Sequence, residues 1–92
     1  MTSKERIKNQ RVFDERTSII HDKLLQWLWK WKIDHQRPSK KLILQEWRNF
    51  MNLAEKVAKD GIANKVLFQL RGREMLETFK LFQEIIPEFE LL

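Results

Sequence analysis

Apolar residues between positions 18 and 34 recur at the three- and four-residue spacing of an α-helix. At about 100° per residue, one face of this segment carries Ile20, Leu24, Trp27, Leu28 and Trp31. The opposite face carries a second apolar set, which is Leu25, Trp29 and Ile33. Such a helix is either buried on both sides within a bundle or docked through one face onto another subunit. Two-sided burial is the commoner arrangement, whereas the enrichment of Trp in interface cores favours docking.

Two further segments show the same helical period. One begins after Pro38, which disfavours helix in the residue before it, and Ser39 is placed to cap it. Its apolar stripe is Ile43, Trp47, Phe50, Ala54 and Val57. Gly61 follows this segment, where left-handed backbone geometry costs glycine nothing and ends a helix. The last segment, from about residue 62 to 86, carries Phe68, Met75, Phe79, Phe82 and Ile86.

These stripes predict an all-α protein, a compact bundle of four or five helices. Residues 3–16 either form a separate helix, with Thr17 and Ser18 capping the next one, or belong to one long, bent helix. Gly72 either breaks or kinks the last helix or allows another helix to approach closely. We favour a break or kink, because glycine inside a helix costs about 1 kcal/mol relative to alanine.

Length and composition indicate a single helical domain over residues 1–92, with a mobile basic arm at residues 1–8 and an acidic-apolar tail at residues 87–92. The chain has no Cys, which excludes disulfides and thiolate metal sites. Its longest apolar run, residues 27–29, is far shorter than the roughly 20 residues that span a bilayer. The first residues also lack an apolar secretory signal. We therefore expect an intracellular, cytoplasmic protein without a membrane partner.

No arrangement of residues indicates catalysis. The two histidines, His21 and His35, lack the i, i+4 spacing of a helical metal pair, and we expect them on a helix surface and in a loop. Glu84, Glu88 and Glu90 are close in sequence, but Pro87 separates them and no acid–base geometry follows. We expect no enzyme activity, metal, cofactor or small-molecule substrate.

Charge is distributed unevenly along the chain. Residues 1–41 carry eleven Lys/Arg against five Asp/Glu, and residues 42–73 carry six against three, whereas residues 74–92 carry one against five. A basic body suggests a polyanionic partner such as RNA or DNA. On the segment after Ser39, three- and four-residue steps align one polar side, which is Lys41, Gln45, Arg48, Asn52, Lys56 and Lys59. This side either contacts a nucleic-acid backbone or is an ordinary solvated helix face.

Two smaller basic clusters extend the candidate nucleic-acid site. Arg37, Lys40 and Lys41 lie where a helix begins, and helix N-terminal amides favour anions. Arg71 and Arg73 flank Gly72, where exposed backbone would allow a phosphate to approach.

The layout resembles the small helical subunits of CRISPR effector complexes. The shared features are a short, basic, Cys-free helical chain, polar ridges and aromatic stripes. In this chain the ridge is Lys41-Arg48-Lys56-Lys59 and the stripe is Phe68-Phe79-Phe82. The resemblance implies a non-catalytic, RNA-binding subunit of a ribonucleoprotein in antiviral defence. Several copies would contact each other through apolar patches and hold a nucleic-acid strand by its backbone.

Other functions are open. A protein–protein interaction module, such as a phage-type inhibitor or adaptor, would dock through Leu25, Trp29 and Ile33 or through the basic side. A helix-turn-helix DNA-binding regulator fits less well, because residues 39–60 are too long for its first helix.

Overall fold

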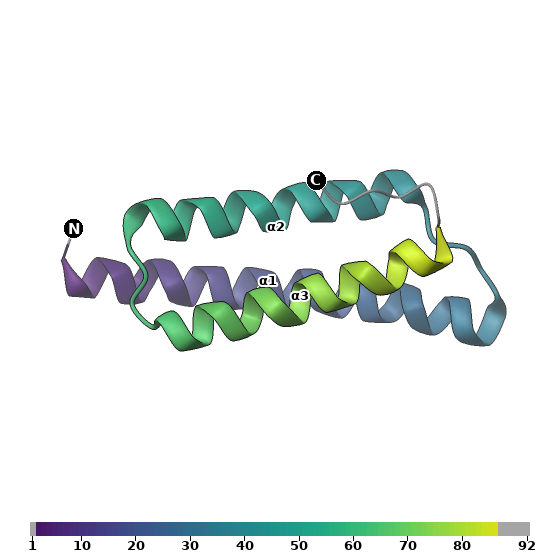
Figure 1. The fold of residues 1–92 in the computed structure, drawn as a ribbon, viewed down its shortest axis with the longest axis horizontal. Helices are drawn as coiled ribbons and strands as arrows, with labels where there is room; N and C mark the ends of the chain where they lie inside the picture. The colour runs from purple at the N-terminus through teal and green to yellow at the C-terminus, as the bar shows by residue number, and fades with distance from the viewer. Residues whose placement is uncertain (1, 87–92) are drawn as a thin grey trace.

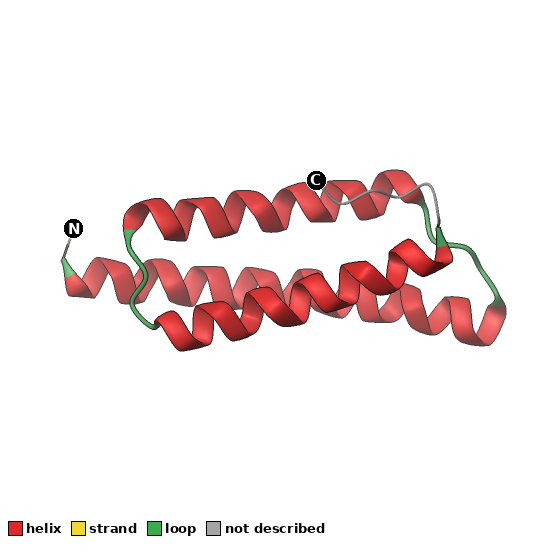
Figure 2. Ribbon diagram, viewed as in Figure 1, coloured by secondary structure: helices red, strands yellow, loops and turns green. Residues whose placement is uncertain are grey.

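The computed structural model describes residues 2–86, and these residues form three α-helices. The helices are α1 (Ser3–Asp34), α2 (Lys40–Asp60) and α3 (Lys65–Ile85). The chain reverses after α1 and again after α2, so α3 runs parallel to α1 (Figure 1). Figure 2 shows that all regular structure in residues 2–86 is helical. The all-α class is therefore confirmed, whereas the prediction of four or five helices is wrong.

Thr17 is one of two positions at which the predicted helices could have ended or begun, and it lies inside α1. Its hydroxyl donates a hydrogen bond to the carbonyl of Phe13, with Oγ1 and O separated by 2.7 Å. A threonine bonded to the i−4 carbonyl in this way remains within a helix, although the same hydroxyl is suited to capping. Residues 3–34 therefore form one helix of 32 residues, about 48 Å long. Residues 3–8 of the predicted arm are its first turns, and the mobility predicted for them stays a prediction.

Gly72 is the second such position, and it lies within α3. The helix runs unbroken from Lys65 to Ile85, so a break at Gly72 is wrong, whereas a kink there stays a prediction. A Cβ placed at Gly72 would have no neighbouring atom within 4 Å apart from the adjoining backbone, so close approach of another helix is wrong too. Phe68 and Met75, on either side, pack against or within the core. Their burial offsets the helix cost of the glycine.

Replacement of Gly72 by alanine is therefore expected to stabilise the fold. Alanine gains about 1 kcal/mol of helix propensity and meets no clash, which for a domain of this size raises Tm by about 4–8 °C. Thermal unfolding followed by circular dichroism measures the change. Gly61→Ala is the contrasting variant, because Gly61 has φ +106° and a Cβ there would lie 2.8 Å from Nε of Arg6. An unchanged or lower Tm for Gly72→Ala would contradict this account.

Side-chain caps set the starts of the helices. Ser39 Oγ accepts a hydrogen bond from the amide of Leu42, and Asn64 Oδ1 accepts one from the amide of Leu67. The predicted Ser39 cap is confirmed. Gly61 ends α2 with a positive φ, as predicted, although its ψ of 132° lies outside the left-handed helical region.

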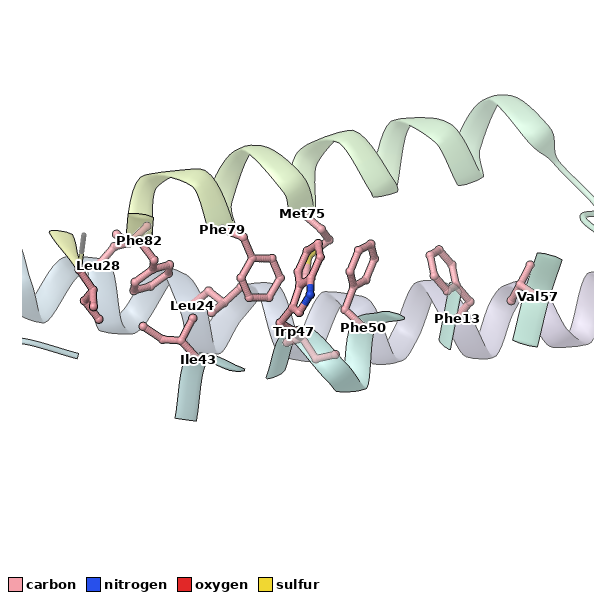
Figure 3. Close-up of a cluster of buried hydrophobic side chains, with 12 residues drawn as sticks. Phe13, Leu24, Leu28, Ile43, Trp47, Phe50, Val57, Met75, Phe79 and Phe82 are labelled. Carbon is pink, nitrogen blue, oxygen red and sulfur yellow. The ribbon is translucent and has the colours of Figure 1, made fainter. Parts of the chain in front are cut away.

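The core lies along the line where the three helices meet. Figure 3 shows side chains from all three helices in this shared interior, with Phe79 of α3 close to Trp47 and Phe50 of α2. The rings of Trp47 and Phe79 meet edge to face with centroids 4.9 Å apart. Most residues of the predicted stripes face inward, although Trp31 is only partly buried. The buried apolar residues are Phe13, Ile20, Leu24, Leu28, Ile43, Trp47, Phe50, Val57, Met75, Phe79, Phe82 and Ile86.

Two polar contacts fix the register of α3 on α1. Gln10 is buried, and its amide donates to the carbonyl of Asn64 and accepts from the amide of the same residue. About three turns further along α1, His21 Nε2 lies 3.0 Å from Oγ1 of Thr78. The single hydroxyl proton of Thr78 is donated to the carbonyl of Glu74, so Nε2 of His21 is the donor. The side chain of His21, predicted to lie on a helix surface, is therefore only partly exposed and links α1 to α3.

A charged cluster lies between these two contacts. Asp14 faces Arg71 across the α1/α3 contact, and Arg71 also pairs with Glu74, with Nη1 and Oε2 3.4 Å apart. Partial burial raises the pKa of Asp14, and the positive charge of Arg71 opposes this only in part. Asp14 Oδ1 and Arg71 Nε are buried without a hydrogen-bond partner among the described residues.

The raised pKa predicts that Asp14→Asn is more stable than the wild type at pH 7. A carboxyl whose pKa is higher in the folded than in the unfolded state costs stability as pH rises from about 3.9 through the folded pKa. Asparagine carries no such charge, so its advantage should disappear below about pH 3.9. Tm measured for both proteins across pH tests this. A lower Tm of the variant at pH 7 would show that attraction to Arg71 outweighs the cost of burial.

Candidate nucleic-acid interface

The predicted polar side of α2 faces solvent over the whole helix. All six of its residues are exposed, and we call them the basic ridge: Lys41, Gln45, Arg48, Asn52, Lys56 and Lys59. They lie opposite the buried stripe of α2, because the core occupies the other side of the helix. From Lys41 to Lys59 the ridge is about 27 Å long at 1.5 Å per residue. The structure thus brings together most of the predicted backbone-binding residues on one surface.

The basic ridge adjoins a groove between α1 and α2 that sequence reasoning missed. Its larger hollow has a volume of about 460 Å³ and a second hollow about 370 Å³, and the two share Arg16, Leu53 and Lys56. Lys23 of α1 lines the larger hollow, and Lys8 lines the second. We call these two hollows the α1/α2 groove; the residues that line it include Lys8, Arg16, Ile19, Lys23, Glu46, Asn49, Asn52, Leu53 and Lys56.

A sequence signal for the groove exists on α1. Lys8, Arg16 and Lys23 follow each other at steps of eight and seven residues, which is about two helical turns each. These steps place the three cations along one side of a helix. The pattern becomes meaningful only when α2 is known to pack beside that side, because Lys56 and Asn52 come from the other helix.

Glu46 is an acidic residue that lines the larger hollow. It does not belong to the basic ridge: it is buried toward α1, where its Oε1 lies 3.4 Å from Nζ of Lys23. The side chain of Lys23 is half exposed, so the pair contributes little to stability, of the order of 0–1 kcal/mol. Its functional consequence is that Lys23 is partly neutralised at the wall of the groove.

Replacement of Glu46 by glutamine is expected to strengthen the binding of a polyanion. The change removes the carboxylate that pairs with Lys23 and frees this half-exposed ammonium group for a phosphate, a contact worth roughly three- to ten-fold in affinity. Fluorescence anisotropy with a labelled oligonucleotide at low salt measures it. Glu77→Gln, an exposed acid on α3 away from the basic ridge and the groove, is the control. Equal gains in both variants would show an effect of net charge rather than of the groove.

The predicted cluster at the start of α2 continues the basic ridge. Arg37, Lys40 and Lys41 are exposed, and a hollow of about 330 Å³ is lined by Lys40, Lys41, Leu44 and Arg48. Lys41 and Arg48 belong to the basic ridge itself. The cluster and the ridge therefore form one continuous basic surface.

Arg71 and Arg73 lie on α3 and are not joined to the basic ridge. Arg71 is half-buried against α1 and pairs with Glu74, whereas Arg73 is exposed. The premise of exposed backbone at Gly72 is wrong, because this residue lies inside a continuous helix. Its amide is not at a helix end where orphan N–H groups meet anions.

The second apolar face of α1 is open to solvent. Trp29 is 64 % exposed, Ile33 56 % and Leu25 46 %, and we call these three residues the apolar patch. The interpretation that this face is buried within the bundle is therefore wrong for the isolated chain. Leu81 of α3 is also exposed and lies beyond the contact of His21 with Thr78, as Leu25 does on α1. The apolar patch thus approaches the α1/α3 boundary.

The described residues offer little for other chemistry. Among residues 2–86 we find no group of three or more His, Cys, Asp or Glu side chains placed to hold a metal ion. In the same part of the chain, the three helices all fall short of the length and apolarity that crossing a membrane requires. Glu88 and Glu90 lie outside the described residues.

Comparison with known proteins adds no relative from which a role for these surfaces follows. No protein-family model, curated protein or solved structure matches the chain.

Proposed function

We propose that the protein is a non-catalytic nucleic-acid-binding subunit that holds a backbone without strong sequence specificity. The observation that carries the proposal is the continuous basic surface formed by the ridge on α2 and by the cations of α1 in the neighbouring groove. Lys and Arg side chains neutralise phosphates and release bound counterions, and this term is independent of sequence. Gln45 and Asn52 add neutral hydrogen-bonding groups along the same track.

The surface favours backbone contacts over base reading by a recognition helix. Its side chains lie along the length of a helix rather than at the first turns of a short helix that enters a major groove. In the first turns of α3, Phe68 packs against the core, and the exposed side chains of Val66 and Leu70 are apolar rather than base-reading. A helix-turn-helix regulator is accordingly the less favoured form of nucleic-acid binding.

Titration of labelled RNA and DNA oligonucleotides at several salt concentrations tests the proposal. We expect binding at low salt and a linear fall of log K with log salt, with a slope close to −0.9 per neutralised phosphate on duplex DNA and about −0.7 on single strands. A sulfated polysaccharide serves as a competitor of similar charge. Absence of binding to every oligonucleotide at about 50 mM salt would contradict the proposal.

We further propose that the protein acts inside a ribonucleoprotein, as the resemblance to small CRISPR effector subunits implies. Several copies would lie side by side along a strand, each presenting its basic surface to the nucleic acid. Contacts between neighbouring copies would raise the affinity of each, because the strand holds them at a high effective concentration. Isolation of the tagged protein from its source cells, with sequencing of the nucleic acid and mass spectrometry of the proteins recovered, tests this form.

A protein–protein interaction module is the second candidate, and the exposure of Trp29 favours it. An exposed Trp between two exposed aliphatic residues is typical of the centre of a docking site. Trp29→Ala should abolish binding of a protein partner, and nucleic acid should not compete with that partner. A partner retained after nuclease treatment and lost with this variant would support the module. A partner still held by Trp29→Ala would exclude the apolar patch.

A further inference from the structure

The α1/α2 groove holds apolar side chains that phosphate binding alone does not use. Ile19 lines the larger hollow and is 58 % exposed, and Leu53 lines both hollows. Resting on the proposed function, we propose that this groove binds single-stranded nucleic acid, with an unpaired base seated against Ile19 and Leu53. The basic ridge beside it follows the phosphates of the same strand.

The charges around the groove fit one strand crossing between two helices. Arg16 and Lys23 come from α1 and Lys56 comes from α2, so cations stand on both walls of the larger hollow. The carboxylate of Glu46 is paired with Lys23 and nearly buried, which limits its repulsion of a phosphate. A strand within the groove therefore meets positive charge on either side.

The general spacing of packed helices favours a single strand over a duplex. The axes of packed helices are about 8–10 Å apart, whereas a duplex is broad enough to carry a major groove about 12 Å wide on one side. A duplex would rest on the crests of the helices and contact cations there. It would leave Ile19 and Leu53 exposed, since the faces of its bases are stacked and its base edges are paired.

The polar groups beside this apolar floor suit the edge of an unpaired base. Asn49 and Asn52 line the same hollow as Ile19. A side-chain amide both donates and accepts hydrogen bonds, so it can pair with the Watson–Crick edge of any base in some orientation. Such contacts need a base that is unstacked and unpaired. They give weak base preference, in keeping with backbone-dominated binding.

Fluorescence anisotropy with a single-stranded oligonucleotide of about 12 nucleotides and a duplex of the same length tests the inference; this length lies within the range of about 4–16 nucleotides that single OB-fold domains cover. We expect the wild type to bind the single strand more tightly than the duplex at equal salt. Ile19→Ser should weaken single-strand binding about five-fold and leave duplex binding unchanged, because it removes apolar contact and no charge. Val66→Ser is the matched control, an exposed apolar residue on α3 outside the groove.

The outcomes separate this inference from the proposed function. Equal or tighter binding of the duplex, or equal single-strand affinities of Ile19→Ser and Val66→Ser, would overturn the inference while backbone binding stands. If the wild type binds neither oligonucleotide at low salt, the proposed function itself is overturned. If Ile19→Ser does not fold, Asn49→Ala examines the same hollow at an exposed polar position, with the same expected loss for the single strand only.

Discussion

Replacement of Phe79 by alanine is expected to lower the free energy of unfolding by about 3–5 kcal/mol. Phe79 is fully buried, and its ring lies 4.9 Å from that of Trp47 and 6.4 Å from that of Phe50. Truncation would remove the transfer energy of the ring and leave a cavity at the meeting point of the three helices. Domains have roughly 0.05–0.15 kcal/mol of stability per residue, so this loss is a large share of the total for a chain of 92 residues.

Urea unfolding followed by circular dichroism measures this effect as a shift of the midpoint. Val66→Ala, on the same helix, is the control, because Val66 is 77 % exposed and should change stability by less than about 0.5 kcal/mol. If Phe79→Ala unfolds the protein outright, Phe79→Leu is the milder replacement and keeps the comparison measurable. Similar midpoints for Phe79→Ala and Val66→Ala would contradict the position of Phe79 at the centre of the core.

The inward faces of the helices could be predicted because burial leaves a periodic trace in the sequence. Ile43, Trp47, Phe50 and Val57 recur at helical spacing and are all buried. The number of helices could not be predicted in the same way. Local preferences at Thr17 and Gly72 disfavour helix by about 1 kcal/mol or less, and packing of the long helices outweighs such terms.

The candidate site shows the same division between local and tertiary information. The basic ridge could be predicted because all its residues lie on one helix and repeat at steps of three and four. The α1/α2 groove could not, because Arg16 and Lys56 are 40 positions apart and meet only when α1 and α2 pack. The sequence also could not show whether the second apolar face of α1 is buried or exposed. Its exposure depends on α2 and α3 both packing against the other side.

Reversal of two charges on the basic ridge, Arg48→Glu together with Lys56→Glu, is expected to weaken nucleic-acid binding at least about ten-fold at low salt. Each exposed ion pair is worth about 1 kcal/mol in water at 4 Å, and reversal replaces attraction by repulsion at both positions. The slope of log K against log salt should fall by about one for each lost phosphate contact. Both residues are exposed, so circular dichroism and Tm should remain close to those of the wild type.

The matched control is Arg11→Glu together with Lys32→Glu, which changes the net charge by the same amount. Arg11 and Lys32 are exposed on α1 and belong neither to the basic ridge nor to the α1/α2 groove. A general effect of net charge would weaken binding equally in both double variants, because long-range attraction depends on the whole protein. Direct phosphate contact by the basic ridge would weaken only the first and reduce only its salt slope. Unchanged binding by Arg48→Glu/Lys56→Glu would remove the ridge from the account, and the cations of α1 in the groove would then be the remaining candidates.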